Sequence, residues 1–519
     1  MAIKKNPFTI FILTLFEVCA VYTLFCGITD LGEAKPAPFL WSGAAILVFA
    51  AALYAVIALA KLASWRKLAF LRNGKQRQAA AAERAMVAAT LLMSAALRIW
   101  VIHALPIAPS SDFQTYYQVA ELLAKGELLS SGYAGYISQF PHVIGYPFLL
   151  SLLFRITGPS LYAGLYLNAV AGLCSAFLVY RIARILGGRL AGILALLAAA
   201  FWPSQLLYGA ILASEPVFVC MLLICARLFL YLYSYPVRFE NREGAMYVCV
   251  ALGVALAFAN AVRPLATVFL IAAMLCLLPS TKRFTKSEKM LNGRLSRASC
   301  QGWFLAALVA VSFFVVGGFL NARISDAIGY TLPGSGVSFG YNLMVGLNVE
   351  AKGSWNQPDA DFFAAQFAAA NATAAHKASM GVALTRLKSA PADILNLMLE
   401  KFSYLWKNDN YGATWTTLFL KQQGALTSAR QSIIDRFTQC NDVFYLLSIF
   451  FSAAYAVRLF QRQTESPAQV FLLLFIGTSA LHMLVESQNR YHYLMLPVFT
   501  ILAAMGIADI FKTHVAAPA

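Results

Sequence analysis

Apolar segments about as long as a membrane-spanning helix recur from one end of this chain to the other. A helix needs roughly 20 apolar residues to cross the hydrocarbon core of a bilayer. Of the 519 residues, 60% are hydrophobic and only 12% are charged. The sequence therefore predicts an all-α, polytopic membrane bundle with about twelve spans, at residues 7–27, 40–60, 85–105, 160–182, 189–207, 214–233, 245–260, 264–279, 302–320, 441–459, 468–486 and 492–511.

Basic residues gather on one side of these spans. Lys and Arg precede the first span and follow the even-numbered ones, as at 61–84, 181–189, 282–297 and 458–462. Short loops rich in Lys and Arg are retained in the cytoplasm, so we predict that both termini are cytoplasmic. Topology then explains the net charge of +17. Because this charge is dispersed over many short loops, nucleic acid is not the expected partner.

The N-terminal region 1–84 contains two predicted spans and a basic cytoplasmic loop. The first span follows Lys4 and Lys5, as the apolar core of a signal peptide would. It lacks a clear small-x-small cleavage site and is longer than such a core. We therefore interpret it as a retained helix.

The first long outer segment, 106–158, carries an acidic residue in a polar run. Asp112 follows Ser110 and Ser111 and precedes an amphipathic stretch. Ser111 with Gln114 fits a capping box, and Gly126 fits a helix stop. We therefore predict a surface helix with Asp112 in its first turn. The apolar run 148–156 is too short to span the membrane and is interpreted as an interfacial helix.

The second long outer segment, 321–440, is predicted to form a small extracytoplasmic domain. Glycines, amides, an indole and carboxylates are dense in 340–348 and 353–361. Such side chains suit a polar ligand rich in hydroxyl groups. Helices are expected at 361–380 and 391–407.

Several short motifs occur in a fixed order on one predicted side of the membrane. They are Ser-Asp-x-x-x-Tyr-Tyr at 111–117, Gly-Tyr-Pro at 145–147, Ala-Ser-Glu-Pro at 213–216, Val-Arg-Pro at 262–264 and Arg-Tyr at 490–491. Together they resemble the GT-C glycosyltransferases, in particular bacterial members akin to the protein mannosyltransferases and the aminoarabinose transferase of lipid A. The resemblance covers roughly 85–510. We expect the chain to divide there into a core at 85–320, the outer domain at 321–440, and C-terminal helices at 441–519.

The resemblance implies transfer of a sugar from a polyprenyl phosphate donor to an acceptor on the outer face of a bacterial plasma membrane. The acceptor would be a cell-envelope glycan, lipid or protein. Asp112 matches the family's catalytic carboxylate, as a general base or a metal ligand, and Glu215 resembles a second acidic position. One base suffices for a single displacement with inversion, whereas retention requires a nucleophile. We therefore hypothesise inversion.

Each of these residues could instead have a purely structural role. Asp112 could simply stabilise a helix N-terminus, and Glu215 could be a solvated interfacial acid. Arg263 and Arg490 are candidate ligands of the donor phosphate, because a guanidinium binds phosphate oxygens in a fixed fork. Arginines near helix ends also reach lipid headgroups.

Further candidates on the donor side are Tyr491 and His142. Tyr491 could instead belong to an interfacial aromatic belt, and His142 could be an ordinary polar residue. Arg98, about two turns below the outer end of its span, could pair with a carboxylate or contact a lipid phosphate. We assign it no role.

Acceptor recognition is the expected role of four outer residues: Trp355, Asn356, Asp359 and Asp361. The alternative is that they only cap and pack the outer domain. Asp112 and Glu215 would also offer oxygen ligands to Mg²⁺, Mn²⁺ or Ca²⁺, so a divalent cation is kept as an option.

Two rival functions remain at this stage. A ligase or transferase of lipid-linked oligosaccharides would differ in its donor. A flippase or transporter of lipid-linked sugars should show related halves and polar groups near the membrane midplane.

Overall fold

The structure, a computed structural model, describes residues 7–33, 74–234, 242–278, 297–334, 337–462 and 466–515. Within these ranges the regular secondary structure is helical and contains no strand, which confirms the all-α prediction. Among the described residues, eight helical segments are long and apolar enough to cross a membrane. They are α1 (Pro7–Glu33), α3 (Gly74–Ala104), α7 (Leu161–Gly187), α10 (Glu215–Ser234), α11 (Arg242–Val262), α13 (Arg297–Ile328), α19 (Ser428–Arg462), and η4 (Asn489–Met495) continuing into α21 (Leu496–Val515).

Three predicted spans are helices shorter than expected. They are α8 (Arg189–Ala200), α12 (Ala266–Leu277) and α20 (Gln469–Leu484). The predicted span 189–207 is wrong as one helix, because Trp202 is extended and a separate helix, α9 (Pro203–Tyr208), begins at Pro203. Proline restricts the residue before it to extended conformations. The predicted span 40–60 lies outside the described residues.

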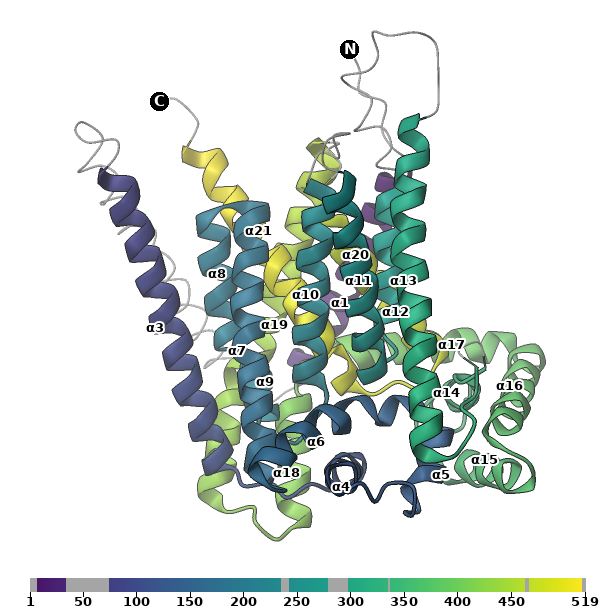
Figure 1. Cartoon of the computed structure of the whole chain (residues 1–519). Coiled ribbons are helices and arrows are strands. Elements are labelled where there is room, and N and C mark those ends of the chain that lie inside the picture. Colours follow the sequence, from purple (N-terminus) through teal and green to yellow (C-terminus); the bar gives the residue numbers. More distant parts are fainter. Residues whose placement is uncertain are drawn as a thin grey trace.

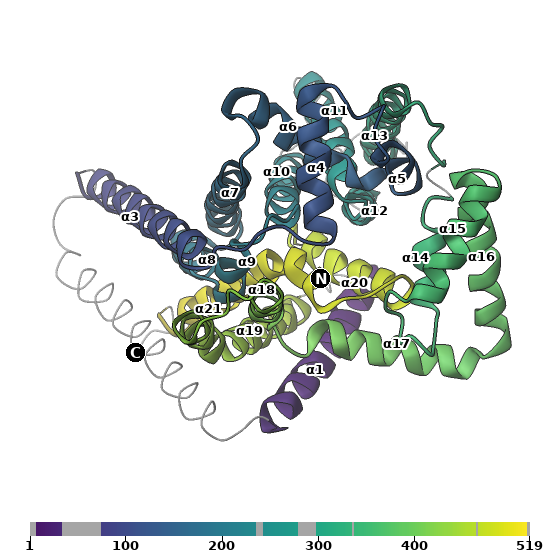
Figure 2. The same cartoon turned by 90° about the horizontal axis from the view of Figure 1, so that it is seen from below.

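A layer of short helices lies across one end of the bundle (Figures 1 and 2). These helices connect or follow the long ones and belong to the predicted outer side: α4 (Asp112–Lys125), α5 (Tyr133–Gln139), η1 (Pro141–Val143), α6 (Gly145–Thr157), α9 and α18 (Tyr411–Gln422). The predicted helix 148–156 is thus present, and it begins three residues earlier. Gly145 allows its start to approach α11, since a Cβ there would overlap the Ala261 carbonyl.

The region expected as an outer domain forms a helical group beside the bundle (Figure 2). Its helices are α14 (Gly340–Gly346), α15 (Gln357–Ala369), α16 (Ala372–Ser389) and α17 (Pro391–Trp406). The single helix expected at 361–380 is instead split between α15 and α16, because Asn371 caps a new helix through a bond from the Ala374 N–H. Tyr341, Phe363 and Ile394 belong to a small hydrophobic core of this group.

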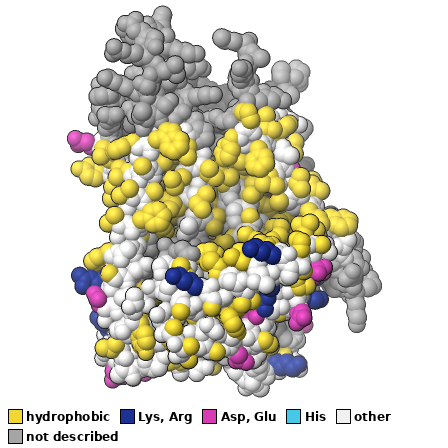
Figure 3. Space-filling model, turned by 90° about the vertical axis from the view of Figure 1, so that its right-hand side faces the viewer, with side chains coloured by type: hydrophobic (Ala, Val, Ile, Leu, Met, Phe, Trp, Pro, Cys, Tyr) yellow, Lys and Arg dark blue, Asp and Glu magenta, His cyan; other side chains and the backbone are white. Residues whose placement is uncertain are grey.

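The surface is divided by polarity. Figure 3 shows a band of hydrophobic side chains across the middle of one face and most of the charged side chains below it. Phe314 and Phe319 are among the exposed apolar side chains of α13. Such a band is what the hydrocarbon core of a bilayer requires. The chain is therefore a multi-pass membrane protein.

Candidate active site at the layer of short helices

Asp112 is the first residue of α4, in the layer of short helices. Its side chain is 52% exposed. The predicted helix stop is confirmed, because Gly126 adopts the left-handed conformation with φ 78°. The predicted capping box is wrong: Ser111 makes no side-chain cap and has φ 54°. A positive φ is rare for a serine and strains the joint before Asp112.

Arg490 meets Asp112 from η4, at the other end of the sequence. Its Nη2 lies 3.2 Å from Oδ2 of Asp112, and its side chain is only 6% exposed. Its guanidinium lies 4.7 Å from the centroid of the Trp415 ring, and the rings of Phe113 and Tyr491 are also within 6 Å. A cation over aromatic faces is attracted by their quadrupoles. The ion pair therefore joins a half-exposed carboxylate to a nearly dry guanidinium.

Glu215 and Arg263 form a second, deeper ion pair. Glu215 begins α10 and is fully buried, and its Oε1 lies 2.5 Å from Nη2 of Arg263. Arg263 stands between α11 and α12, where its Nε donates to the Ser214 hydroxyl at 3.1 Å. The Tyr208 hydroxyl donates to Oε1 of Glu215 at 3.2 Å. Glu215 is therefore a buried, paired acid and not a solvated one.

The two pairs belong to one site. Tyr116, on α4, interacts electrostatically with Asp112, Glu215, Arg263 and Arg490 together. His142, on η1, interacts with Arg263 and Asp112. The structure thus brings together every residue predicted on the donor side, since Tyr491 follows Arg490 and contacts its guanidinium.

Two buried polar atoms at this site have no hydrogen-bond partner. They are Oε2 of Glu215 and Nε of Arg490. A buried polar atom without a partner costs about 1–3 kcal/mol. Such unpaired atoms in both ion pairs are consistent with a place prepared for a polar ligand.

The four predicted acceptor residues lie on the helical group beside the bundle. Asn356 caps α15 by accepting from the Asp359 N–H. Asp359 is buried and accepts from Arg386 at 2.7 Å. Burial alone would raise the pKa of Asp359, but hydrogen bonds from Arg386, Asn348 and Asn356 lower it below its ordinary value. These two residues are fully engaged within the fold.

The other two acceptor candidates face outward. Trp355 is 56% exposed, and Asp361, which is also exposed, accepts a hydrogen bond from Gln357 at 2.8 Å. Of the four, Trp355 is the side chain best placed to meet an external ligand.

The carboxylates of the site do not suit a divalent cation while they are paired with arginines. Asp112 and Glu215 each face a guanidinium. In the part of the chain that the structure describes, no group of three or more His, Cys, Asp or Glu side chains is arranged to hold a metal ion. A cation would have to displace an arginine from one of these carboxylates.

Glu486, which follows α20, was not predicted from the sequence as a site residue. It interacts electrostatically with Arg490 and Asp112. Burial raises its pKa, and a hydrogen bond from Gln488 at 2.8 Å opposes this rise. The sequence signal that could have indicated Glu486 is its position four residues before Arg490, on the same predicted side of the membrane.

Residues 141–316 match the family model of the dolichyl-phosphate-mannose-protein mannosyltransferases. The matched part contains His142, Glu215 and Arg263, while Asp112 and Arg490 lie outside it. For this part of the chain, the match confirms the predicted resemblance to GT-C membrane glycosyltransferases. A search of curated proteins finds no match.

Solved structures give distant likenesses. The Archaeoglobus fulgidus oligosaccharyltransferase in complex with Zn and sulfate is 14% identical with a TM-score of 0.46, over 82% of this chain and 49% of that one. The same enzyme in complex with an inhibitory peptide and a dolichol-phosphate is 14% identical with a TM-score of 0.41, and the match covers 82% of this chain and 50% of that one. ArnT from Cupriavidus metallidurans bound to undecaprenyl phosphate is 14% identical with a TM-score of 0.29, and the match covers 82% of this chain and 78% of that one. The chain spans about half the length of the archaeal enzyme.

Proposed function

We propose that this protein transfers a sugar from a polyprenyl phosphate to an acceptor of the cell envelope on the outer face of a bacterial plasma membrane. The observation that carries the proposal is the Asp112–Arg490 ion pair beside the buried Glu215–Arg263 pair. Asp112 is on α4, in the layer of short helices at one end of the bundle (Figure 1). Arg490, Glu215 and Arg263 meet it from η4, from the start of α10 and from the joint between α11 and α12, and a carrier lipid could present its phosphate there from the membrane.

The two arginines supply the charge that the leaving group needs. A donor phosphodiester carries one negative charge, and departure of the sugar leaves a phosphate with up to two. Fixed guanidinium groups aimed at developing charge in a water-poor site are an effective form of catalysis. Arg263 and Arg490 are both largely buried, and Arg490 has a free N–H in Nε.

Asp112 is placed to act as the base. The acceptor hydroxyl oxygen attacks the anomeric carbon, its proton passes to Asp112, and the bond from that carbon to the phosphate oxygen breaks. The lipid phosphate departs with the electron pair of that bond. Among the described residues of the site, Asp112 is the one half-exposed carboxylate, and we therefore propose a single displacement with inversion of the anomeric centre.

Donor binding and release of the base are linked in this scheme. Arg490 holds Asp112 in the ligand-free chain. A phosphate that binds Arg490 competes with the carboxylate, and the carboxylate then becomes available to the acceptor hydroxyl. Tyr491 and His142 border the donor, and Trp355 with its neighbours Asn356, Asp359 and Asp361 is the proposed acceptor side.

The rival functions differ in what they require. An oligosaccharide ligase would use the same carboxylate and arginines with a larger donor, so the donor panel decides between the two. A flippase should place charge near the membrane midplane, whereas the four charged residues above meet at the end of the bundle that carries α4.

The deciding experiment compares purified wild type with Asp112→Asn on a panel of polyprenyl phosphate sugars and envelope acceptors. Loss of a general base should lower kcat by about 10²- to 10⁴-fold, with donor binding retained. Asp326→Asn, an exposed change at the end of α13, should transfer sugar at the wild-type rate. Equal turnover by Asp112→Asn would refute the assignment, and a product anomer matching the donor would refute inversion.

A further inference from the structure

Helix α18 lies against the Asp112–Arg490 pair, although none of its residues takes part in the proposed chemistry. The Trp415 ring lies 4.7 Å from the guanidinium of Arg490. The ring of Phe419 meets that of Phe113, the residue after Asp112, edge to face with 5.6 Å between the ring centroids. Because Phe113 is fully buried, the first turn of α4 is packed against α18.

Gln423, at the end of α18, binds the chain on the other side of Asp112. Its Oε1 accepts from the Ala108 N–H at 3.1 Å, and its Nε2 donates to the Ala108 carbonyl oxygen at 2.8 Å. One side-chain amide thus bonds both backbone polar groups of a single residue, as a neighbouring β-strand would. Ala108 lies four residues before Asp112 in the loop that leads into α4, so α18 holds the chain before and after the carboxylate.

This double hold bears on the strained residue between the two contacts. Ser111 has φ 54° and makes no side-chain cap. A serine keeps such a conformation only where the surrounding structure over-determines it. Gln423 fixes the chain at Ala108, and Phe419 fixes it at Phe113. These contacts are therefore a physical reason for the conformation of Ser111.

The end of α18 that carries Gln423 is itself well fixed. The Ala425 N–H donates to the Leu420 carbonyl oxygen at 2.8 Å. The Gly424 N–H donates to the Lys421 carbonyl oxygen at 3.1 Å. Together these bonds form the Schellman motif, which satisfies the last carbonyl groups of a helix. The motif fixes the backbone from which the Gln423 side chain extends.

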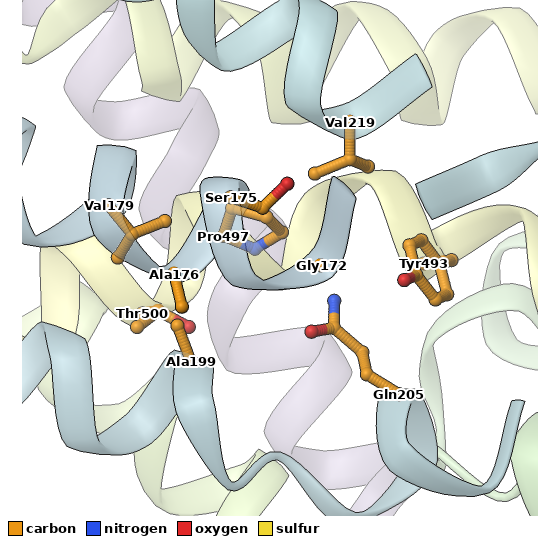
Figure 4. Close-up of a pocket in the computed structure, with 10 residues that line it drawn as sticks. All are labelled: Gly172, Ser175, Ala176, Val179, Ala199, Gln205, Val219, Tyr493, Pro497 and Thr500. Atoms are coloured by element: carbon orange, nitrogen blue, oxygen red, sulfur yellow. The ribbon is translucent and has the colours of Figure 1, made fainter. Parts of the chain in front are cut away.

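α18 is joined through α9 to η4, which carries Arg490. The Tyr208 ring of α9 lies 5.3 Å from the ring of Tyr411 on α18 and 5.6 Å from the ring of Tyr493 on η4. Gln205 of α9 and Tyr493 line an internal cavity of about 10 Å³ (Figure 4). A cavity of this size has room for about one water molecule. α18, α9 and η4 therefore form one closely packed support for the ion pair.

We propose that Gln423 is a positioning residue for the catalytic base. By holding the loop at Ala108, it keeps Asp112 beside Arg490 and at the place where the acceptor hydroxyl arrives. It acts through the backbone of residues 108–112 and not by touching a substrate. The inference rests on the proposed function of Asp112 as a base, and it adds the element that orients this carboxylate. A displacement of about 1 Å at a reacting group can lower the rate about 10²-fold.

The test replaces Gln423 by methionine, which has nearly the same length but neither polar atom. Gln422→Met, an exposed change one residue earlier, is the matched control. Hydrogen–deuterium exchange of the full chain in detergent should be about fivefold faster at the Ala108 amide of Gln423→Met, because this N–H loses its acceptor. In transfer assays with the donors and acceptors used for Asp112→Asn, its kcat should fall about tenfold or more at an unchanged donor KM.

Gln422→Met should match the wild type in exchange at Ala108 and in kcat. The Tm values of the two variants should agree within about 2 °C, as expected for exposed substitutions. Unchanged exchange at Ala108 in Gln423→Met, or a wild-type kcat despite faster exchange, would overturn the inference and leave the proposed function standing. A wild type that transferred no sugar from any donor of the panel would overturn the proposed function and the positioning role with it.

Discussion

At the scale of single residues, the candidate site depends on contacts between distant parts of the sequence. Asp112 and Arg490 were predictable as candidate site residues, because charge stands out in apolar sequence. Their pairing was not, because 378 positions separate them and no local pattern encodes that contact. The strain at Ser111 was not predictable either. The sequence around it predicts a capping box, but in the structure Ser111 has a positive φ and makes no side-chain cap.

His492 illustrates the same point within the core. Its Nδ1 lies 2.8 Å from the Leu405 carbonyl and its Nε2 lies 2.6 Å from Oδ1 of Asp409. Both are acceptors. The other oxygen of Asp409 accepts from Trp202 and Ser204, each at 2.6 Å. A carboxylate with this many donors is ionised, so we predict that His492 is doubly protonated and holds η4 in place.

Solid-state ¹⁵N NMR of histidine-labelled protein in lipid at neutral pH checks this. The chain has six histidines, and His492→Asn assigns the signal. We expect two protonated ring nitrogens at His492 in the wild type. Asp409→Asn should leave one of them unprotonated and cost about 3–5 kcal/mol of stability, as loss of one partner of a buried ion pair does. A neutral His492 in the wild type would contradict the prediction.

At the scale of helices, the sequence showed where helices lie better than where they break. Most spans of uniform apolar composition were located within a few residues, since hydropathy is a local property. The spans predicted at 302–320 and 441–459 belong to longer helices, Arg297–Ile328 and Ser428–Arg462. The break between α8 and α9 had a local signal in Pro203, which the prediction passed over. The division between α15 and α16 had a weaker one in Asn371, whose role as a cap depends on a turn that an alanine-rich sequence does not reveal.

Lys401 ties three of these helical elements together. Its Nζ donates to the carbonyls of Gly346, Met483 and Val485 at 2.7–3.0 Å. Burial lowers the pKa of Lys401 to about 7, whereas an unfolded lysine titrates near 10.4. Between these values the unfolded chain binds more protons than the folded chain, so this group makes the free energy of unfolding rise with pH.

The variant Lys401→Met lacks this contribution. We therefore expect the Tm of the wild type to gain on that of Lys401→Met as the pH is raised from 7 to 10 in the same detergent. Lys421→Met, on α18, changes an exposed lysine and should show no such trend. A gap that stays constant or narrows would show that Lys401 does not titrate in this range.

At the scale of the whole molecule, the layer of short helices and the basic loop ends lie at opposite ends of the bundle. Glu83 pairs with Arg184 and Arg189 at the end away from α4, and Asp509 pairs with Arg458 and Arg462 there. The all-α bundle was predictable because composition and span length are global properties. The placement of the α14–α17 group beside it was not, since it depends on side-chain packing between helices.

Sidedness is testable in intact cells. In a background without the native cysteines, Lys388→Cys on α16 should react with a membrane-impermeant maleimide added outside. Gln461→Cys, near the end of α19, should react only after the membrane is permeabilised. The positive-inside distribution of Lys and Arg is the physical reason. Labelling of Gln461→Cys from outside in sealed cells would reverse the proposed orientation.

The aromatic rings around Arg490 have one more consequence, for the influence of salt. Mobile ions screen charges that stand in water, and they act weakly on charges enclosed by protein. With Phe113, Trp415 and Tyr491 around it, Arg490 keeps most of its attraction for an anion when the ionic strength rises. A half-exposed carboxylate such as Asp112 loses more. Concentrated electrolyte therefore weakens the hold of Asp112 on Arg490 more than the affinity of Arg490 for an enclosed anion.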